Sequence, residues 1–167
     1  MTGTLDITIN KTSKSRIHEV DFQNISFGKV YSDHMFIADY VDGQWKDLRI
    51  EPFRHLSMSP ANAALHYGQS IFEGMKAHRG PEGSALIFRP DMNARRFNRS
   101  AVRMCMPEIP EEIFTGALAE LVRLDRDWIP DQEGTSLYLR PFMFASDEYI
   151  GVRPSLTYRF MIFRSEE

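Results

Sequence analysis

The sequence has little of several features that mark particular classes of protein. A single cysteine, Cys105, excludes an internal disulfide and a cysteine-rich metal site. No apolar run is long enough to span a bilayer, and the first twenty residues lack the apolar core of a secretory signal. Lys and Arg number 20 against 23 Asp and Glu, a net charge of −3, which argues against nucleic-acid binding through bulk charge. We therefore expect a cytoplasmic protein with no membrane or nucleic-acid partner.

Common catalytic and metal-binding motifs are also absent. The sequence contains no P-loop, no G-x-G-x-x-G and no G-x-S-x-G. None of the five histidines has metal-ligand spacing, so we interpret them as structural or surface residues and predict no metal site. What remains is the composition of an ordinary globular domain, 43% hydrophobic and 26% charged over 167 residues.

The order of the predicted elements indicates the fold class. Apolar periodicity, turns and caps predict two hairpins, a helix between them, two further helices and two final strands. The predicted extended segments are 35–41, 44–50, 76–79, 85–89, 136–144 and 155–164, and the predicted helices are 60–73, 91–104 and 110–122. Because the strands cluster rather than alternating with helices, we expect an α+β fold with an antiparallel or mixed sheet flanked by helices. Residues 1–20 are polar and are expected to form a mobile lead-in.

Glycine and proline give two local predictions. Ser59-Pro60 has the residues typical of a helix start, and Gly74 is expected to end that helix in the left-handed conformation. Pro141 interrupts an extended segment. It suggests a sheet edge or a bulge, because proline lacks the N–H that a ladder needs.

Tyr138 and Arg140 are the first candidates for ligand binding. Residues two apart in a strand face the same side, so these two should project together while Leu137 and Leu139 face the core. A guanidinium beside a phenol can receive a carboxylate, because arginine offers a planar fork of donors. An ordinary exposed strand face would have the same spacing, so both interpretations stay open at this point.

Arginines of the predicted helix 91–104 are the second candidates. Arg96, Arg99 and Arg103 share one stripe of that helix, and one of them could hold a phosphate. A solvated cationic face is the alternative. Tyr67 and Phe72 could line a pocket or could belong to the core.

Four segments taken together resemble the branched-chain amino acid aminotransferases, which are fold-type IV enzymes that use pyridoxal 5'-phosphate. The similar segments keep the family's order and spacing between about Phe27 and Phe163. They are Phe-Gly-Lys-Val-Tyr-Ser-Asp-His-Met (27–35), Leu-His-Tyr-Gly-Gln-Ser-Ile-Phe-Glu-Gly-Met-Lys-Ala-His-Arg-Gly (65–80), Arg-Ser-Ala-Val-Arg (99–103) and Ser-Leu-Tyr-Leu-Arg-Pro (136–141). The resemblance implies the small-domain fold of the D-amino acid aminotransferase-like class. Asp-His-Met and Tyr-x-Arg-Pro favour the branched-chain branch over D-amino acid aminotransferases and aminodeoxychorismate lyases.

The resemblance implies a role for each matching residue. Arg96 matches the arginine that binds the cofactor phosphate, and Tyr138 and Arg140 match the pair that positions the substrate carboxylate. Other matches concern the apolar side-chain pocket, which would select an aliphatic group by burying it. Its walls would include Phe27, Tyr67 and Phe72, while Val152 matches a residue that reaches the partner subunit's pocket in the family's homodimer.

The reaction implied by the resemblance transfers an amino group between leucine, isoleucine or valine and 2-oxoglutarate, with pyridoxal phosphate as the electron sink. The family's Schiff-base lysine belongs to a second, large domain, and none of the five lysines here matches it. We therefore expect 21–167 to be the N-terminal small domain of such an enzyme, inactive alone, with the large domain outside this chain. The alternatives are a stand-alone ligand-binding or interaction module on the same fold, and a D-amino acid aminotransferase or aminodeoxychorismate lyase relative.

Overall fold

The computed structural model describes residues 5–22, 24, 28–132 and 134–166. Its strands are β1 (Thr8–Ile9), β2 (His34–Val41), β3 (Gln44–Pro52), β4 (Ser70–Phe72), β5 (Met75–Arg79), β6 (Ala85–Ile87), β7 (Leu137–Ala145) and β8 (Tyr158–Glu166). Its helices are α1 (Ala63–Tyr67), α2 (Pro90–Arg103) and α3 (Glu111–Leu124), with 3-10 turns at Ile17–Glu19, Pro81–Gly83 and Arg126–Trp128.

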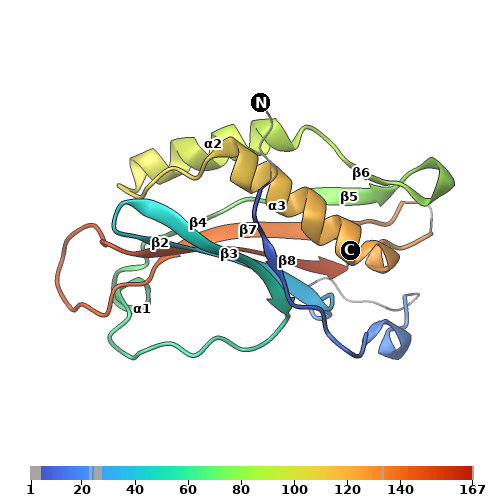
Figure 1. Ribbon diagram of the computed structural model, residues 1–167, viewed down its shortest axis with the longest axis horizontal. Helices are drawn as coiled ribbons and strands as arrows, with labels where there is room; N and C mark the ends of the chain where they lie inside the picture. Colours follow the sequence, from blue (N-terminus) through green and yellow to red (C-terminus); the bar gives the residue numbers. More distant parts are fainter. Residues whose placement is uncertain (1–4, 23, 25–27, 133, 167) are drawn as a thin grey trace.

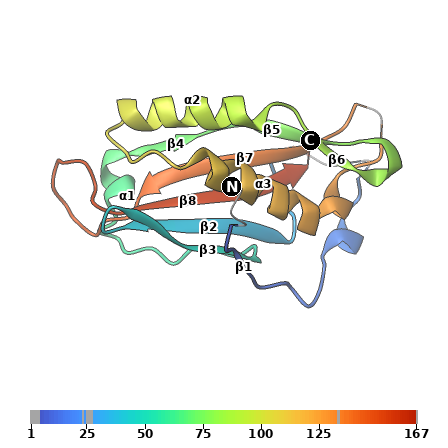
Figure 2. The same cartoon turned by 45° about the horizontal axis from the view of Figure 1, so that its top comes forward.

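One mixed sheet forms the centre of the molecule. Its strand order is β1-β3-β2-β8-β7-β5-β6, and β4 pairs with β7 off this path. The β1–β3 pairing is parallel, whereas the other described pairings are antiparallel. Helices α2 and α3 lie on the same face of the sheet (Figures 1 and 2). The predicted α+β class with a mixed sheet is confirmed.

The main core lies between this face and the two helices. Phe160 of β8 meets Phe97 of α2 at 5.5 Å and Phe114 of α3 at 5.7 Å, measured between ring centroids. Burial of each such side chain stabilises the fold by about 1.5–3 kcal/mol. The residues that α3 buries are those selected by helical spacing, namely Ile113, Phe114, Ala117, Leu118, Leu121 and Val122.

The opposite face of the sheet is covered only in part. A smaller apolar cluster of Met35, Ile37, Phe144 and Met161 lies there. Side chains that include Phe53 and Leu56 pack against it. Along β7, Leu137 and Leu139 are fully buried, whereas Tyr138 and Arg140 are only partly covered. The sidedness expected for this strand is therefore present.

The predicted helix 60–73 is wrong. Helix α1 has only five residues: it is capped by Asn62, whose side chain accepts from the Ala64 N–H at 3.0 Å, and it ends at Gly68 with φ 65°. Residues 70–72 form β4 instead, since branched and aromatic side chains such as Ile71 and Phe72 favour strands. Gly74 is not the helix end; an added Cβ there would collide with the Tyr138 hydroxyl.

The prediction of an edge or a bulge at Pro141 is also wrong. Strand β7 is interior, and its register with β8 runs without a shift from Leu137 to Ala145. On the other side of β7, β4 ends and β5 begins next to Pro141, where the Glu73 N–H donates to the Pro141 carbonyl at 2.8 Å. The interruption of the neighbouring strand accommodates proline, because no acceptor there depends on its missing N–H.

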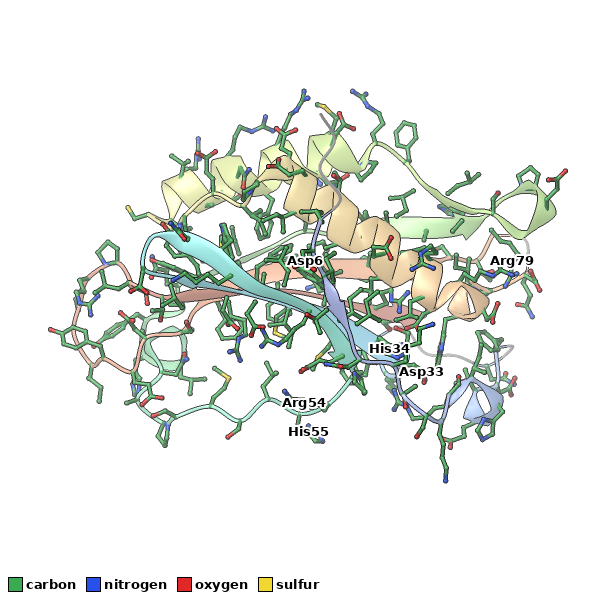
Figure 3. All side chains as sticks on the ribbon, viewed as in Figure 1. Asp6, Asp33, His34, Arg54, His55 and Arg79 are labelled. Carbon is green, nitrogen blue, oxygen red and sulfur yellow. The ribbon has the colours of Figure 1, made fainter. Side chains whose placement is uncertain are left out.

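The N-terminal segment makes specific contacts where the structure describes it. Strand β1 pairs with β3, the Thr12 N–H donates to His34 Nε2 at 2.9 Å, and the Arg16 N–H donates to Asp33 Oδ1 at 2.9 Å. Asp33 and His34 lie next to each other at the start of β2 (Figure 3). The polar composition of residues 1–20 did not indicate this docking.

Candidate functional site

Phe72 is the last residue of β4, and Glu73 and Gly74 connect it to β5; these three residues are called the β4–β5 junction below. Side chains alternate between the two faces of an extended segment. Phe72 pairs with Phe142 on the face that also carries Arg140, whereas Glu73 reaches α2 on the helix-covered face. The junction therefore contacts both predicted anion-binding arginines, one on each side.

On the open face, Arg140 is held by aromatic groups. Its Nη2 donates to the Tyr138 hydroxyl at 2.9 Å, and its guanidinium carbon lies 4.5 Å from the Phe72 ring centroid and 5.2 Å from that of Tyr138. Such cation–π contacts contribute about 0.5–1 kcal/mol each at exposed sites. The Nε of Arg140 is buried and has no hydrogen-bond partner among the described residues. A buried donor without a partner is unusual and is consistent with a guanidinium that awaits an anion.

On the helix-covered face, Arg96 is bound edge-on by Glu73. Its Nε donates to Glu73 Oε1 at 2.6 Å and its Nη2 donates to Oε2 at 2.7 Å, a bidentate pair. The carboxylate is buried, with 5% of its side chain exposed, whereas 60% of the arginine side chain is exposed. In the described part of the chain, Nη1 has no acceptor, so that edge of the guanidinium is open to a ligand.

Glu73 is ionised in this setting. Burial raises the pKa of its carboxyl, but hydrogen bonds from Arg96 and Asn93, the charge of Arg96 and the Gly74 N–H together bring the pKa below its ordinary value of 4.5. Glu73 in turn raises the pKa of Arg96. The Asn93 side-chain amide donates to Glu73 Oε2 at 3.0 Å. The pair is therefore charged on both sides and anchored by a third group.

The remaining predicted site residues lie in different places. Tyr67, on α1, is 43% exposed and contacts the His66 ring. Val152, in the loop between β7 and β8, is 92% exposed. Both views place that loop beside α1 at one end of the sheet (Figures 1 and 2), and the Ala63 N–H donates to the Asp147 carbonyl at 2.7 Å. Phe27 lies outside the described residues.

The structure thus brings Phe72, Tyr138 and Arg140 together and ties Arg96 to the same junction through Glu73. A cavity of about 440 Å³ lies elsewhere, lined by residues that include Arg16, Tyr31 and Trp128. Its lining contains none of the junction residues, and the chemistry of the arginines makes the junction the better candidate. The described residues contain no cluster that could hold a metal ion. None of their helices combines the length and apolarity of a membrane span.

Sequence reasoning missed Glu73 and Asn93. One signal was available: Glu73 is an acid directly after the apolar pair Ile71-Phe72. Acidic side chains are almost never fully buried without a partner. A search for that partner among the arginines of α2 could have selected Arg96.

Comparison with known proteins gives relatives of one kind. The chain is 45% identical over 163 residues to branched-chain-amino-acid aminotransferase 2 of Bacillus subtilis (strain 168). The matched region covers 97% of this chain and 44% of the relative. It is 42% identical over 168 residues to the branched-chain-amino-acid aminotransferase of Mycolicibacterium smegmatis, covering 98% of this chain and 46% of the relative. The chain therefore spans less than half the length of these relatives. No family model matches it.

Solved structures agree on the fold. One is the T.th. branched-chain amino acid aminotransferase complexed with N-(5'-phosphopyridoxyl)-L-glutamate, with a TM-score of 0.57 and 28% identity over 76% of this chain and 39% of that one. Another is the branched-chain aminotransferase of the archaeon Thermoproteus uzoniensis with norvaline, with a TM-score of 0.56 and 21% identity over 77% and 40% of the two chains. At that identity the second likeness concerns the fold alone.

Proposed function

Because the chain belongs to the branched-chain-amino-acid aminotransferase family, we propose that residues 21–167 are the N-terminal small domain of a pyridoxal-phosphate-dependent transaminase. The complete enzyme would transfer the amino group between leucine, isoleucine or valine and 2-oxoglutarate. The observation that carries the proposal is the pair of arginines on either side of the β4–β5 junction, each with donors available to an anion. We also propose that the complete enzyme is a homodimer located in the cytoplasm.

Each arginine has donors that suit one of two anions, the phosphate of pyridoxal phosphate for Arg96 and the carboxylate of the amino acid substrate for Arg140. Arg96 offers a phosphate the donors of Nη1 while Glu73 holds its other edge. Arg140, fixed by the Tyr138 hydroxyl, offers a donor set to the substrate carboxylate. When bound, the cofactor supplies the electron sink for removal of the substrate α-proton. This chain then contributes anchoring of two anions rather than proton transfer.

The apolar side chains would select the substrate. Phe72 and Tyr67 are exposed enough, at 64% and 43%, to face a ligand. With Phe27 they would form part of a wall against which an aliphatic side chain is buried, at a gain of about 0.8 kcal/mol per CH₂. Val152 would enter the pocket of a partner subunit. Its 92% exposure in the β7–β8 loop is compatible with that role.

The proposed enzyme needs a nucleophilic lysine from outside these 167 residues. None of the five lysines here matches the family's Schiff-base position, and a nucleophilic lysine requires a desolvated or cationic setting. The relatives are more than twice as long as the region matched. Near-normal turnover of leucine and 2-oxoglutarate by the 167-residue chain alone, in a coupled assay, would contradict this part of the proposal.

The test compares two single variants of the complete natural protein, each of which should affect the binding of a different ligand. Arg140→Ala should raise KM for leucine and 2-oxoglutarate by about 10- to 100-fold and leave cofactor affinity unchanged, because loss of a hydrogen bond to a charged group costs about 1.5–3 kcal/mol. Arg96→Ala should instead weaken cofactor retention by a similar factor. Arg99→Ala, an exposed arginine on the same helix, is the matched control and should change neither.

Three results would contradict the proposal in different ways. Equal effects of Arg96→Ala and Arg140→Ala on cofactor retention would refute the division of roles. Faster turnover with D-alanine than with leucine would favour a D-amino acid aminotransferase on the same fold. Absence of cofactor binding by the complete wild-type protein would favour a stand-alone binding module.

A further inference from the structure

We propose that Glu73 is a positioning residue for the cofactor phosphate: it holds the Nε–Nη2 edge of Arg96 so that the Nη1 edge faces the ligand. This inference rests on the proposed function, because it concerns the anion that Arg96 would bind. Neither the sequence pattern nor the names of the relatives assign a role to Glu73.

The first support is the geometry of the pair. Both Glu73 oxygens engage one edge of the guanidinium, at 2.6 and 2.7 Å. A bidentate pair fixes the plane and direction of the guanidinium, which a single hydrogen bond does not. The three donors that remain, one on Nη2 and two on Nη1, therefore point away from Glu73.

The second support is the rigidity of Glu73 itself. Its side chain is 5% exposed, and it receives the Asn93 amide at 3.0 Å and the Gly74 N–H in addition to Arg96. These groups come from the sheet and from the first turns of α2. Arg96, by contrast, is 60% exposed and would sample many rotamers without this hold. The buried acid is the fixed element, and the exposed arginine is what it orients.

Two physical effects of Glu73 on a bound phosphate oppose each other. Its negative charge offsets the charge of Arg96, which weakens the attraction for a dianion. Its hold on the guanidinium removes rotamer freedom before the ligand arrives, so less side-chain entropy is lost when the ligand binds. Because Glu73 lies behind the guanidinium, the charge effect acts over the longer distance. We therefore expect orientation to prevail, so that removing Glu73 weakens phosphate binding rather than strengthening it.

A purely structural tie between α2 and the β4–β5 junction is the competing explanation. It predicts that loss of Glu73 disturbs every ligand of the site alike. A positioning role predicts that only ligands with a phosphate are affected. Pyridoxal, which has the ring and aldehyde of the cofactor but no phosphate, separates the two explanations.

The experiment measures dissociation constants of pyridoxal 5'-phosphate and of pyridoxal by absorbance titration of the complete natural apoprotein. Glu73→Gln, which keeps the size of the side chain but removes its charge, should weaken pyridoxal 5'-phosphate about tenfold and change pyridoxal less than about twofold. Asn93→Ala, which removes a bond to Glu73 and leaves the ion pair, should give a smaller loss with the same selectivity. The matched control is Glu111→Gln, because Glu111 on α3 pairs with Arg95, the neighbour of Arg96 on α2, at 3.4 Å.

Each outcome decides the inference. Unchanged or tighter binding of pyridoxal 5'-phosphate in Glu73→Gln would overturn it, and so would equal weakening of both ligands. If Glu73→Gln does not fold, Asn93→Ala gives the same decision. Arg96→Ala keeps this failure separate from that of the proposed function. If Arg96→Ala weakens phosphate binding while Glu73→Gln does not, only the positioning role fails. If Arg96→Ala has no effect, both fail.

Discussion

Two arginine–carboxylate pairs in this domain use the same chemistry in opposite ways. Arg164 and Asp125 are 0% and 3% exposed, and their partners are protein groups: Arg164 Nη1 donates to the Leu121 carbonyl at 2.9 Å, and the His34 imidazole meets Asp125 Oδ1 at 2.6 Å. Arg96 and Glu73 also form a close ion pair, yet 60% of the Arg96 side chain is exposed.

The two pairs differ in what surrounds the arginine: protein groups in the buried pair, and the surface in the Arg96–Glu73 pair. In the buried pair, Asp125 connects β8, the start of β2 and the end of α3, so its ion pair and hydrogen bonds hold elements together. His34 belongs to that assembly: its Nε2 accepts from the Thr12 N–H, which places the proton on Nδ1 for donation to Asp125. In the Arg96–Glu73 pair, the buried Glu73 carboxylate is fixed and the exposed Arg96 guanidinium presents donors to the surface. Burial of the guanidinium, rather than the presence of an ion pair, separates a structural contact from a candidate ligand site.

The largest expected effect is on stability, in the buried pair. Asp125→Asn should lower the free energy of unfolding by about 3–5 kcal/mol, because it leaves the Arg164 charge buried without its counter-ion. Glu73→Gln should lower it by only about 1 kcal/mol, since the exposed Arg96 can be solvated by water. Urea denaturation of the two variants measures the difference. A larger loss in Glu73→Gln than in Asp125→Asn would reverse the comparison.

A smaller effect is expected at Gly74, where the junction meets the open face. A Cβ added at Gly74 would collide with the Tyr138 hydroxyl and lie 3.0 Å from the ring carbon that carries it. Gly74→Ala should therefore cost about 1–3 kcal/mol of stability and displace the hydroxyl from Arg140. Steady-state kinetics of the complete protein should show a raised KM for leucine with unchanged affinity for pyridoxal 5'-phosphate.

A second variant checks the cause of the Gly74→Ala effect. Tyr138→Phe removes the oxygen that an alanine at position 74 would strike, so the double variant should recover part of the lost stability without recovering the KM. If Gly74→Ala instead weakens the cofactor and leaves the KM intact, Gly74 acts through Glu73 and Arg96, and the two faces of the junction are not separate.

Local pattern predicted the parts of this domain that depend on neighbours in sequence. The apolar stripe of α3 is buried as its spacing indicated. Asp42-Gly43, which lies between the extended segments predicted at 35–41 and 44–50, forms the turn of that hairpin, with φ 54° and 76°. Tyr138 and Arg140 share one face of β7 because strand alternation fixes it. These features need no knowledge of the rest of the chain.

The parts that depend on distant residues could not be predicted in this way. The local pattern predicts a helix end at Gly74, but the need for glycine there comes from the ring of Tyr138, which is remote in the sequence. Glu73 finds Arg96 only because α2 packs over β4, and that packing follows from the whole sheet. The role proposed for Arg96 therefore came from resemblance to a family, whereas the role proposed for Glu73 required the three-dimensional structure.

The smallest expected effect tests whether aromatic contact alone prepares Arg140. Phe72→Leu keeps an apolar side chain but removes the ring that lies 4.5 Å from the guanidinium carbon. The loss of a cation–π contact of about 0.5–1 kcal/mol should raise KM for 2-oxoglutarate about two- to fivefold. Stability should change by no more than about 0.5 kcal/mol, because Phe72 is 64% exposed.

Phe88→Leu, at an 81% exposed position, is the control and should leave the KM unchanged. An unaltered KM in Phe72→Leu would mean that the Tyr138 hydroxyl suffices to orient Arg140. Each arginine would then be positioned by one polar partner, Glu73 for Arg96 and Tyr138 for Arg140.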